Sequence, residues 1–411
     1  MQHDLNTVLV VIGSLVLLLG LFSAFIKNRA VLSVPMIALL AGVLLGPSAL
    51  DVLDPAEWGA QETILEEAAR LTLAIGLMAV ALRLPSGYLT SHWRPLAVMI
   101  ALVMPLMWLT SGALAYLLLD IPLLLALLVG AIVTPTDPVV ASSIVTGEAA
   151  KKTIPDEDRH LLSAESGLND GLAYLLVLLP ILLITEPPGE AWQHWLTTTL
   201  LREVMGGAIF GAAVGYLTGR LLEWSEKAGL IEQPSFLSTT IALAVLVLGG
   251  AKLLGMNGVL GVFIAGMAFD RAVNASERAE EHKVQEAVNQ FFSIPIFALF
   301  GLMAPIPEWL ALGWPGLVLA AAVVALRRLP YVIAARRLLP QLPRGRDVLF
   351  LGWFGPIGVS AMFYAMLALR RTDEPVVWVA GSLAVFVSII VHGASATPFV
   401  KWYERQARES A

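Results

Sequence analysis

Long runs of apolar residues recur along almost the whole chain and set the strongest limit on its fold. Most of these runs approach the roughly 20 residues that an α-helix needs to cross the hydrocarbon core of a bilayer. Charged residues make up 14% of the chain, against about 25% in soluble domains. The sequence therefore predicts an all-α integral membrane protein, with one transmembrane domain over residues 1–411. About thirteen transmembrane helices are expected, at residues 7–26, 30–47, 64–84, 95–118, 121–146, 160–184, 200–222, 236–254, 257–270, 288–304, 314–338, 347–369 and 376–399.

The basic residues between these runs are distributed unevenly between the two sides. With the N-terminus outside, nineteen Lys and Arg residues fall on the cytoplasmic side and four on the opposite side. Cytoplasmic loops of membrane proteins carry such an excess of positive charge. We therefore expect a multi-pass protein of the cell membrane, with the N-terminus outside and the C-terminus in the cytoplasm.

Two of the runs are interrupted by proline and glycine. The run at 121–146 contains Pro135 and Pro138, and the run at 347–369 contains Gly355, Pro356 and Gly358. Proline removes a helical hydrogen bond, and glycine lets the chain unwind. The second interrupted helix comes seven positions after the first in the order of helices, so the two cross the membrane in opposite directions. A pair of discontinuous helices in inverted repeats is typical of the binding site of a secondary transporter. The alternative is two proline kinks that neighbouring helices tolerate.

One acid lies well inside the run at 160–184. A charged side chain at the centre of a membrane helix costs roughly 2.5–3.5 kcal/mol, and such residues usually mark ion or proton pathways. Asp170 can be neutralised by a proton or by a metal cation. Ser166 lies one turn earlier on the same face. With Thr136 of the first interrupted run, these two side chains offer the oxygen ligands that a hard cation such as sodium prefers.

A second polar pair, Glu165 and Asn169, lies beside the first on the same helix face. A purely structural network between helices is the alternative interpretation. It accounts for Glu165 and Asn169, but it leaves Asp170 without an obvious partner. Gly167 and Gly171 are expected to let the first interrupted helix approach closely.

Asp137 allows two interpretations. The order Thr136, Asp137, Pro138 is typical of an N-cap followed by proline at the first helical position, which is a structural role. It is also compatible with an ion-binding carboxylate next to carbonyl groups, such as that of Thr136, freed by the break. Both roles can hold together.

Arg327 and Arg328 lie inside the run at 314–338. Because a buried arginine stays protonated, we expect it to need a carboxylate, and Glu165 is the candidate. Arg328 is predicted to form this structural ion pair. Snorkelling to the interface is the alternative for one of the two.

Three further residues are accessory candidates. Asp270 ends its run on the cytoplasmic side, where a solvated helix end is the default and a cation-attracting position the alternative. His392 titrates in the range of a pH sensor, although a hydrogen-bonded structural histidine is more common. Ser360 follows the second interruption.

Several classes of function are disfavoured. The chain has no cysteine, and no His or second carboxylate clusters with Ser166 as a nucleophile–base pair would require. We therefore expect no enzyme, no cofactor and no nucleic-acid partner. Nothing resembles the selectivity filter of a channel. A secondary transporter of organic anions would need a cationic group at the site, and the candidates Arg327 and Arg328 are expected to be committed to Glu165.

Four motifs, in order along the chain, resemble monovalent cation/proton antiporters of the NhaP type. The closest resemblance is to the branch that contains fungal plasma-membrane sodium/proton antiporters. The motifs lie at residues 134–143 (TPTDPVVASS), 162–173 (LSAESGLNDGLA), 258–270 (GVLGVFIAGMAFD) and 352–364 (GWFGPIGVSAMFY).

The resemblance implies exchange of sodium, and of lithium or potassium, for protons by a homodimer in the lipid bilayer. It implies a core domain with helices near 95–184 and 314–399, and a dimerisation domain with helices near 7–84 and 200–270. Asp170 would carry the ion or proton, with Ser166 as a ligand beside Asn169, and Thr136 and Asp137 would contribute from the broken helix. Exchange of one cation for one proton is the simplest expectation.

The chain departs from this family pattern at two places. Many members carry arginine where Ile357 stands, so Glu165 has one fewer possible partner. Archaeal relatives have an acid in the third helix, and residues 78–81 (MAVA) offer none. The third helix is therefore not expected to contribute an acid to ion binding.

Overall fold

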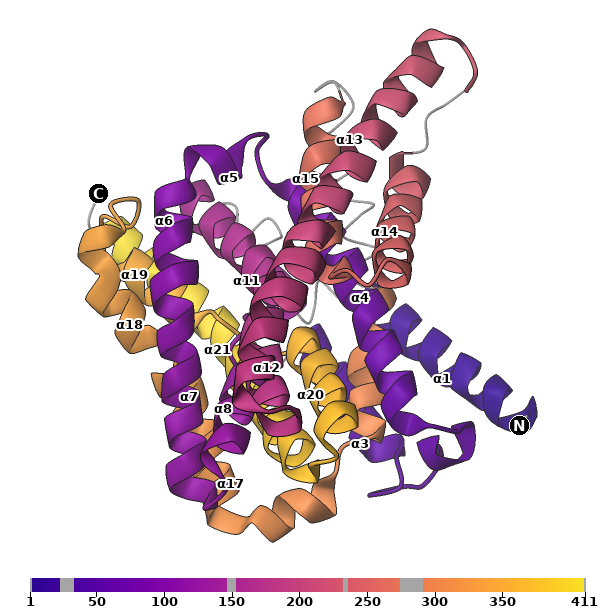
Figure 1. The fold of residues 1–411 in the computed structure, drawn as a ribbon. Coiled ribbons are helices and arrows are strands. Elements are labelled where there is room, and N and C mark those ends of the chain that lie inside the picture. Colours follow the sequence, from indigo (N-terminus) through magenta and orange to yellow (C-terminus); the bar gives the residue numbers. More distant parts are fainter. Residues whose placement is uncertain (1, 23–32, 146–152, 232–235, 274–290, 410–411) are drawn as a thin grey trace.

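The computed structural model describes residues 2–22, 33–145, 153–231, 236–273 and 291–409, and this part of the chain contains helices and no β-strand. Figure 1 shows α13, α14 and α15 together on one side, with α6, α7, α18 and α19 on the other. The first half comprises α1 (Gln2–Leu21), α3 (Val34–Leu45), η1 (Pro55–Trp58), α4 (Gln61–Arg83), α5 (Tyr88–Ser91), α6 (Trp93–Val98), η2 (Met99–Val103), α7 (Met104–Leu119), α8 (Leu123–Ile132), α9 (Pro138–Val145), α11 (Asp156–Thr185) and α12 (Pro188–His194).

The second half comprises η3 (Trp195–Met205), α13 (Gly206–Lys227), α14 (Phe236–Leu253), α15 (Gly258–Ala272), an apolar helix Phe291–Leu302, α17 (Ile306–Leu326), α18 (Leu329–Ala334), η5 (Ala335–Leu338), α19 (Gly345–Trp353), α20 (Val359–Thr372) and α21 (Pro375–Glu409). The segments η2 and η3 are π-helical and continue directly into α7 and α13.

The apolar runs coincide with these helices. Each of the thirteen predicted runs overlaps one described helix or two to three consecutive helical elements, although residues 23–26, 30–32, 146 and 288–290 lie outside the described part. Six helical stretches in the described part are long and apolar enough to cross a membrane: Trp93–Leu119, Asp156–Thr185, Pro188–Lys227, Phe236–Leu253, Ile306–Leu338 and Pro375–Gln406. The exact number of crossings stays a prediction.

Both interrupted runs are broken helices. The first divides into α8 and α9, with residues 133–137 between them, and the second into α19 and α20, with residues 354–358 between them. Proline begins α9, where its missing N–H would have no helical partner. The breaks thus lie where the proline and glycine pattern predicts them.

The helices pack in two groups. In one group α15 contacts α4, α13 and α14, and in the other α7, α8, α11, α17, α20 and α21 pack on one another. The groups meet where α11 contacts α15 and where α20 contacts α4. At the second boundary the guanidinium of Arg370 donates to Glu66 at 2.5 Å.

A stripe of glycines brings α13 very close to α15. Gly207, Gly211, Gly215 and Gly219 recur every four residues and are all buried. A Cβ on Gly211 would collide with the backbone carbonyl of Gly261 in α15. Small residues at this spacing let helix backbones approach in membranes, where van der Waals packing supplies the attraction.

The expected role of Gly167 and Gly171 is wrong. A Cβ on Gly167 would collide with Phe263, and one on Gly171 with Leu260. Both partners belong to α15 and not to the first broken helix. The helical period identifies the residues that share a face, but it does not identify the neighbour that the face meets.

We expect Gly211→Ala to lower the melting temperature of the purified protein, because the added methyl group would separate α13 from α15. Gly249→Ala in α14 is the matched control, since nothing lies within 4 Å of a Cβ at that position. It should leave the melting temperature unchanged or raise it slightly, because alanine is the better helix former. Equal melting temperatures for the two variants would contradict the close α13–α15 contact.

Candidate ion-binding site

The two breaks lie against each other in the interior of the protein. We call residues 133–137 and 354–358 together the crossing. Inside it, the backbone N–H of Asp137 donates to the carbonyl of Pro356 at 2.8 Å. Two half-helices therefore begin at this point, α9 and α20, and two end there, α8 and α19.

Asp137 caps the two half-helices that begin at the crossing. Its Oδ1 accepts the N–H of Val139 in α9 at 2.6 Å, and its Oδ2 accepts the N–H of Val359 in α20. A Cβ on Gly358 would collide with this carboxylate, so only glycine leaves the space. A negative charge is favourable at both helix N-termini. These contacts match the N-cap interpretation of Asp137, and the same carboxylate also caps a second helix, α20.

Arg327 holds the ends of the other two half-helices. Its guanidinium donates to the carbonyls of Val133, Thr134 (2.7 Å) and Pro135 (3.3 Å) after α8, and to that of Gly355 after α19. Carbonyl groups at helix C-termini attract a positive charge. The expectation that both buried arginines need a carboxylate is therefore wrong for Arg327, because backbone carbonyls satisfy it.

Arg328 and Glu165 meet as a buried bidentate pair. Nη1 donates to Oε1 at 2.8 Å and Nη2 to Oε2 at 3.0 Å, and both side chains are at most 2% exposed. Nε of Arg328 donates to the carbonyl of Leu351 in α19 at 2.9 Å. This fork links α11 to the segment that follows α17.

Asn169 connects α11 to the first break. Its amide donates to Glu165 at 2.8 Å and to the hydroxyl of Thr136 at 2.6 Å, and its carbonyl oxygen accepts the N–H of Thr136 at 3.1 Å. The hydroxyls of Thr136 and Ser166 lie 3.0 Å apart. These four side chains thus form one continuous network.

Asp170 differs from its neighbours. Its side chain is fully buried, and within the described part of the chain neither carboxylate oxygen makes a hydrogen bond. The fully buried hydroxyl of Ser360 is also without a hydrogen bond there. Buried polar groups in proteins are nearly always paired, so two unpaired neighbours mark a place where a ligand can bind.

The other accessory residues are buried but serve different contacts. His392 shares a hydrogen bond with the Ser388 hydroxyl at 3.0 Å, and its Nε2 lies 3.0 Å from the carbonyl of Trp353. Ser388 also accepts the N–H of Ile357 at 2.8 Å, so α21 holds both ends of the second break. Asp270 is 4% exposed, and its interpretation as a solvated helix end is therefore wrong.

Comparison of the sequence with models of protein families shows to which family the chain belongs. A family model described as "Sodium/hydrogen exchanger, transmembrane" matches residues 13–402. The chain belongs to the sodium/hydrogen exchanger family. The membership predicted from the four motifs is thus confirmed, and it places the chain among transporters and not among enzymes.

Individual relatives agree with this membership. The chain is 32% identical, over 95% of its length, to a probable Na+/H+ antiporter of Schizosaccharomyces pombe, of which it covers 55%. It is also 32% identical, over 98% of its length, to a Na+/H+ antiporter of the same yeast, of which it covers 92%. It thus spans about half the length of the first of these curated relatives and nearly all of the second.

A solved structure shares the fold. The sodium proton antiporter MjNhaP1 from Methanocaldococcus jannaschii matches with a TM-score of 0.69 at 18% identity, over 97% of this chain and 99% of that one. The all-helical membrane fold of the NhaP type is therefore confirmed.

Sequence reasoning about this chain missed two contacts on α11. The hydroxyl of Tyr364 in α20 donates to the backbone carbonyl of Asp170. The side chain of Asn257, which caps α15, donates to the carbonyl of Gly171 at 3.1 Å. Tyr364 lies four residues after Ser360 and ends the motif at 352–364, and these are the signals in the sequence that link it to the site.

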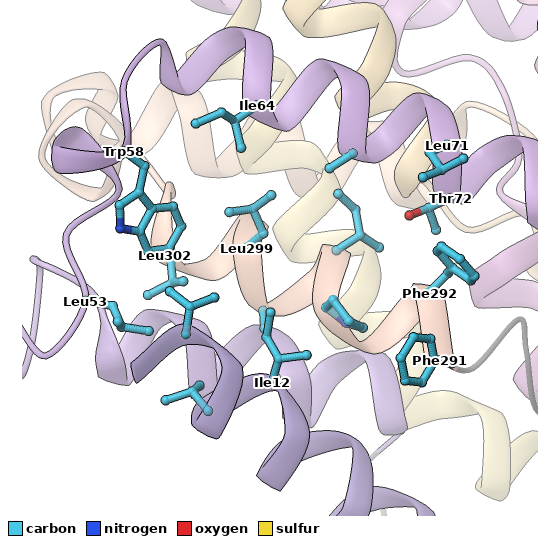
Figure 2. A pocket seen from close by; sticks show the side chains of 16 residues that line it. Ile12, Leu53, Trp58, Ile64, Leu71, Thr72, Phe291, Phe292, Leu299 and Leu302 are labelled. Atoms are coloured by element: carbon cyan, nitrogen blue, oxygen red, sulfur yellow. The ribbon is translucent and has the colours of Figure 1, made fainter. Parts of the chain in front are cut away.

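A cavity elsewhere in the protein does not suit a cation. It has a volume of about 370 Å³ and lies between α1, α4 and the helix Phe291–Leu302 (Figure 2). Of the described residues that line it, none is charged, and the Thr72 hydroxyl and the Trp58 ring nitrogen are the polar side-chain groups visible there. Placing an unpaired ion in such surroundings is strongly unfavourable.

We expect Glu165→Gln to destabilise the protein by about 3–5 kcal/mol, because it leaves the Arg328 guanidinium buried without a carboxylate. The melting temperature in detergent measures this loss. The double variant Glu165→Gln/Arg328→Gln should recover part of it. Glu67→Gln is the control, because Glu67 is 38% exposed and its pair with Lys252 lies at the surface. A Glu165→Gln variant as stable as the Glu67→Gln control would contradict the buried pair.

Proposed function

We propose that this chain exchanges a monovalent cation for protons across the membrane by alternating access. Sodium is the first candidate, with lithium and potassium next. The observation that carries the proposal is the carboxylate of Asp170, which is fully buried and unpaired within the described part of the chain. Family membership and the names of the fungal relatives support the same function.

The buried charges around the crossing support a single carrier group. Asp137 and Arg327 serve opposite ends of the half-helices, and Glu165 pairs with Arg328. These four charges sum to zero. Ionised Asp170 adds one negative charge, which either one proton or one monovalent cation neutralises.

This charge balance leads to a mechanism. A proton and a cation compete for the Asp170 carboxylate, and either one leaves the site neutral. The empty, ionised site would cross the membrane core with an uncompensated charge, which is costly. Only the site that holds a proton or a cation then alternates readily between the two sides of the membrane. This prevents an ion from crossing without exchange. One cation is exchanged for one proton, and the exchange is electroneutral.

The neighbours of Asp170 have distinct roles in this proposal. Thr136 and Ser166 supply hydroxyl oxygens near the cation, which is cargo and not a resident cofactor. Asn169 holds the first break against α11. The described residues contain no group of three or more His, Cys, Asp or Glu side chains that could hold a metal ion.

Two domains with different tasks fit the helix packing. We infer a core domain from helices near 95–184 and 314–399, which contains the crossing, and a dimerisation domain from helices near 7–84 and 200–270. The close packing of α13 on α15 would make the dimerisation domain rigid, so that the core domain can move against it. The functional unit would be a homodimer surrounded by membrane lipids.

We expect Asp170→Asn to abolish cation-driven proton movement, because the amide can neither bind a proton nor balance a cation. The assay uses proteoliposomes with an internal pH dye, to which sodium, lithium or potassium is added. Asp120→Asn is the control: Asp120 is exposed in the α7–α8 turn with φ 51°, which asparagine also tolerates. Wild-type exchange by folded Asp170→Asn would remove the proposed carrier.

The charge bias between loops supports an outside N-terminus and a cytoplasmic C-terminus in the cell membrane. Because the sequence contains no cysteine, single cysteines can report the side of each loop. We expect a membrane-impermeant maleimide to label Glu57→Cys in intact cells and Lys401→Cys only after the membrane is opened. Both positions are exposed. The reverse labelling pattern would invert the proposed topology.

A further inference from the structure

The first turn of α20 faces the carboxylate of Asp170. Tyr364 of α20 donates its hydroxyl hydrogen to the backbone carbonyl of Asp170, which brings α20 against this point of α11. Ser360 precedes Tyr364 by four residues, so both lie on the same face of the helix. The hydroxyl of Ser360 is accordingly a polar neighbour of the Asp170 side chain.

Apart from each other, neither of these neighbours has a polar partner among the described residues. The hydroxyl oxygen of Ser360 and both carboxylate oxygens of Asp170 are buried, and no other described residue forms a hydrogen bond with them. An unsatisfied buried polar group costs about 1–3 kcal/mol. Ser360 follows Val359, whose N–H is bound by Asp137, and the capped first turn fixes its backbone. Two unpaired oxygen groups held next to each other favour a cation between them.

The other hydroxyls of the site are already engaged. Thr136 accepts a hydrogen bond from Asn169 at 2.6 Å and lies 3.0 Å from the hydroxyl of Ser166. A cation bound there would have to compete with this network. Ser360 has no such competing contact among the described residues.

We propose that the hydroxyl of Ser360 is a direct ligand of the alkali cation bound by Asp170 and contributes to the choice between cations. This inference rests on the proposed exchange function and deepens it. A hard cation prefers oxygen ligands, and its selectivity depends on the number and spacing of those ligands. When Asp170 is protonated instead, its O–H can donate to the same serine oxygen. One hydroxyl thus serves both loaded forms.

The test measures exchange in proteoliposomes at a series of sodium, lithium and potassium concentrations. We expect Ser360→Ala to raise the KM for sodium by about tenfold, which corresponds to about 1.4 kcal/mol, with a smaller change in the maximal rate. The ratio of the KM values for lithium, sodium and potassium should change as well. Ser360→Thr keeps the hydroxyl and should stay close to wild type. Ser166→Ala should shift the KM for sodium less than Ser360→Ala does.

Ser111→Ala is the matched control. The Ser111 hydroxyl is also fully buried and without a hydrogen bond in the described part, but it lies in α7, which packs mainly on α8 and α17. This variant should leave the KM for sodium unchanged. A KM for Ser360→Ala within twofold of wild type, or an equal shift in Ser111→Ala, would overturn the assignment.

A binding measurement separates this inference from the proposed function. Sodium should raise the melting temperature of the purified wild type and of Ser360→Thr, because a ligand stabilises the state that binds it. Ser360→Ala should need about tenfold more sodium for the same increase. Exchange by the wild type with an unaltered sodium response in Ser360→Ala would reject the serine ligand alone. No sodium response and no exchange in the folded wild type would reject the proposed function, and the ligand with it.

Discussion

The opposite charges of Asp137 and Arg327 at the crossing are the interaction on which the rest of the site depends. Breaking two helices inside a membrane exposes N–H and C=O groups where no water can satisfy them. One carboxylate caps the two half-helices that begin there, and one guanidinium binds the carbonyls where the other two end. A costly break therefore becomes a stable element with no net charge of its own.

This arrangement gives each buried charge near the crossing a separate task. Glu165 and Arg328 hold α11 to the end of α17, and Asn169 holds α11 to the first break. With these charges paired, Asp170 is the uncompensated acid of the set. The guanidinium groups at the crossing are committed to protein partners, so neither offers the cationic site that an organic anion would need. The organic-anion interpretation therefore has no support in the site.

The sequence predicted the breaks, the carboxylate and the face that carries it, because proline, glycine and helical spacing act locally. It also placed Glu165 and Arg328 correctly in relation to each other, since a buried charge limits the choice of partner. It could not identify the acceptors of Arg327, because free carbonyls at one point arise only when two distant breaks meet. The contact of Tyr364 with the Asp170 backbone was hidden for a similar reason. Every residue has a backbone carbonyl, so the sequence cannot indicate which carbonyl accepts a given hydrogen bond.

The contacts at the crossing also determine where the protein can deform. α11, the end of α17 and α21 are joined to it by hydrogen bonds of Asn169, Arg327 and Ser388, and those of the charged Arg327 are worth about 1.5–3 kcal/mol each. Between α11 and α15 the close neighbours of Gly167 and Gly171 are instead the apolar side chains of Phe263 and Leu260. Asn257, at the N-terminal end of α15, also donates to the carbonyl of Gly171 at 3.1 Å, but this hydrogen bond is between neutral groups. The apolar contacts beside it can shift without losing a directional bond. Shear along this boundary is therefore mechanically softer than any rearrangement inside the crossing, and a displaced core would keep its ligand geometry intact while its surroundings change.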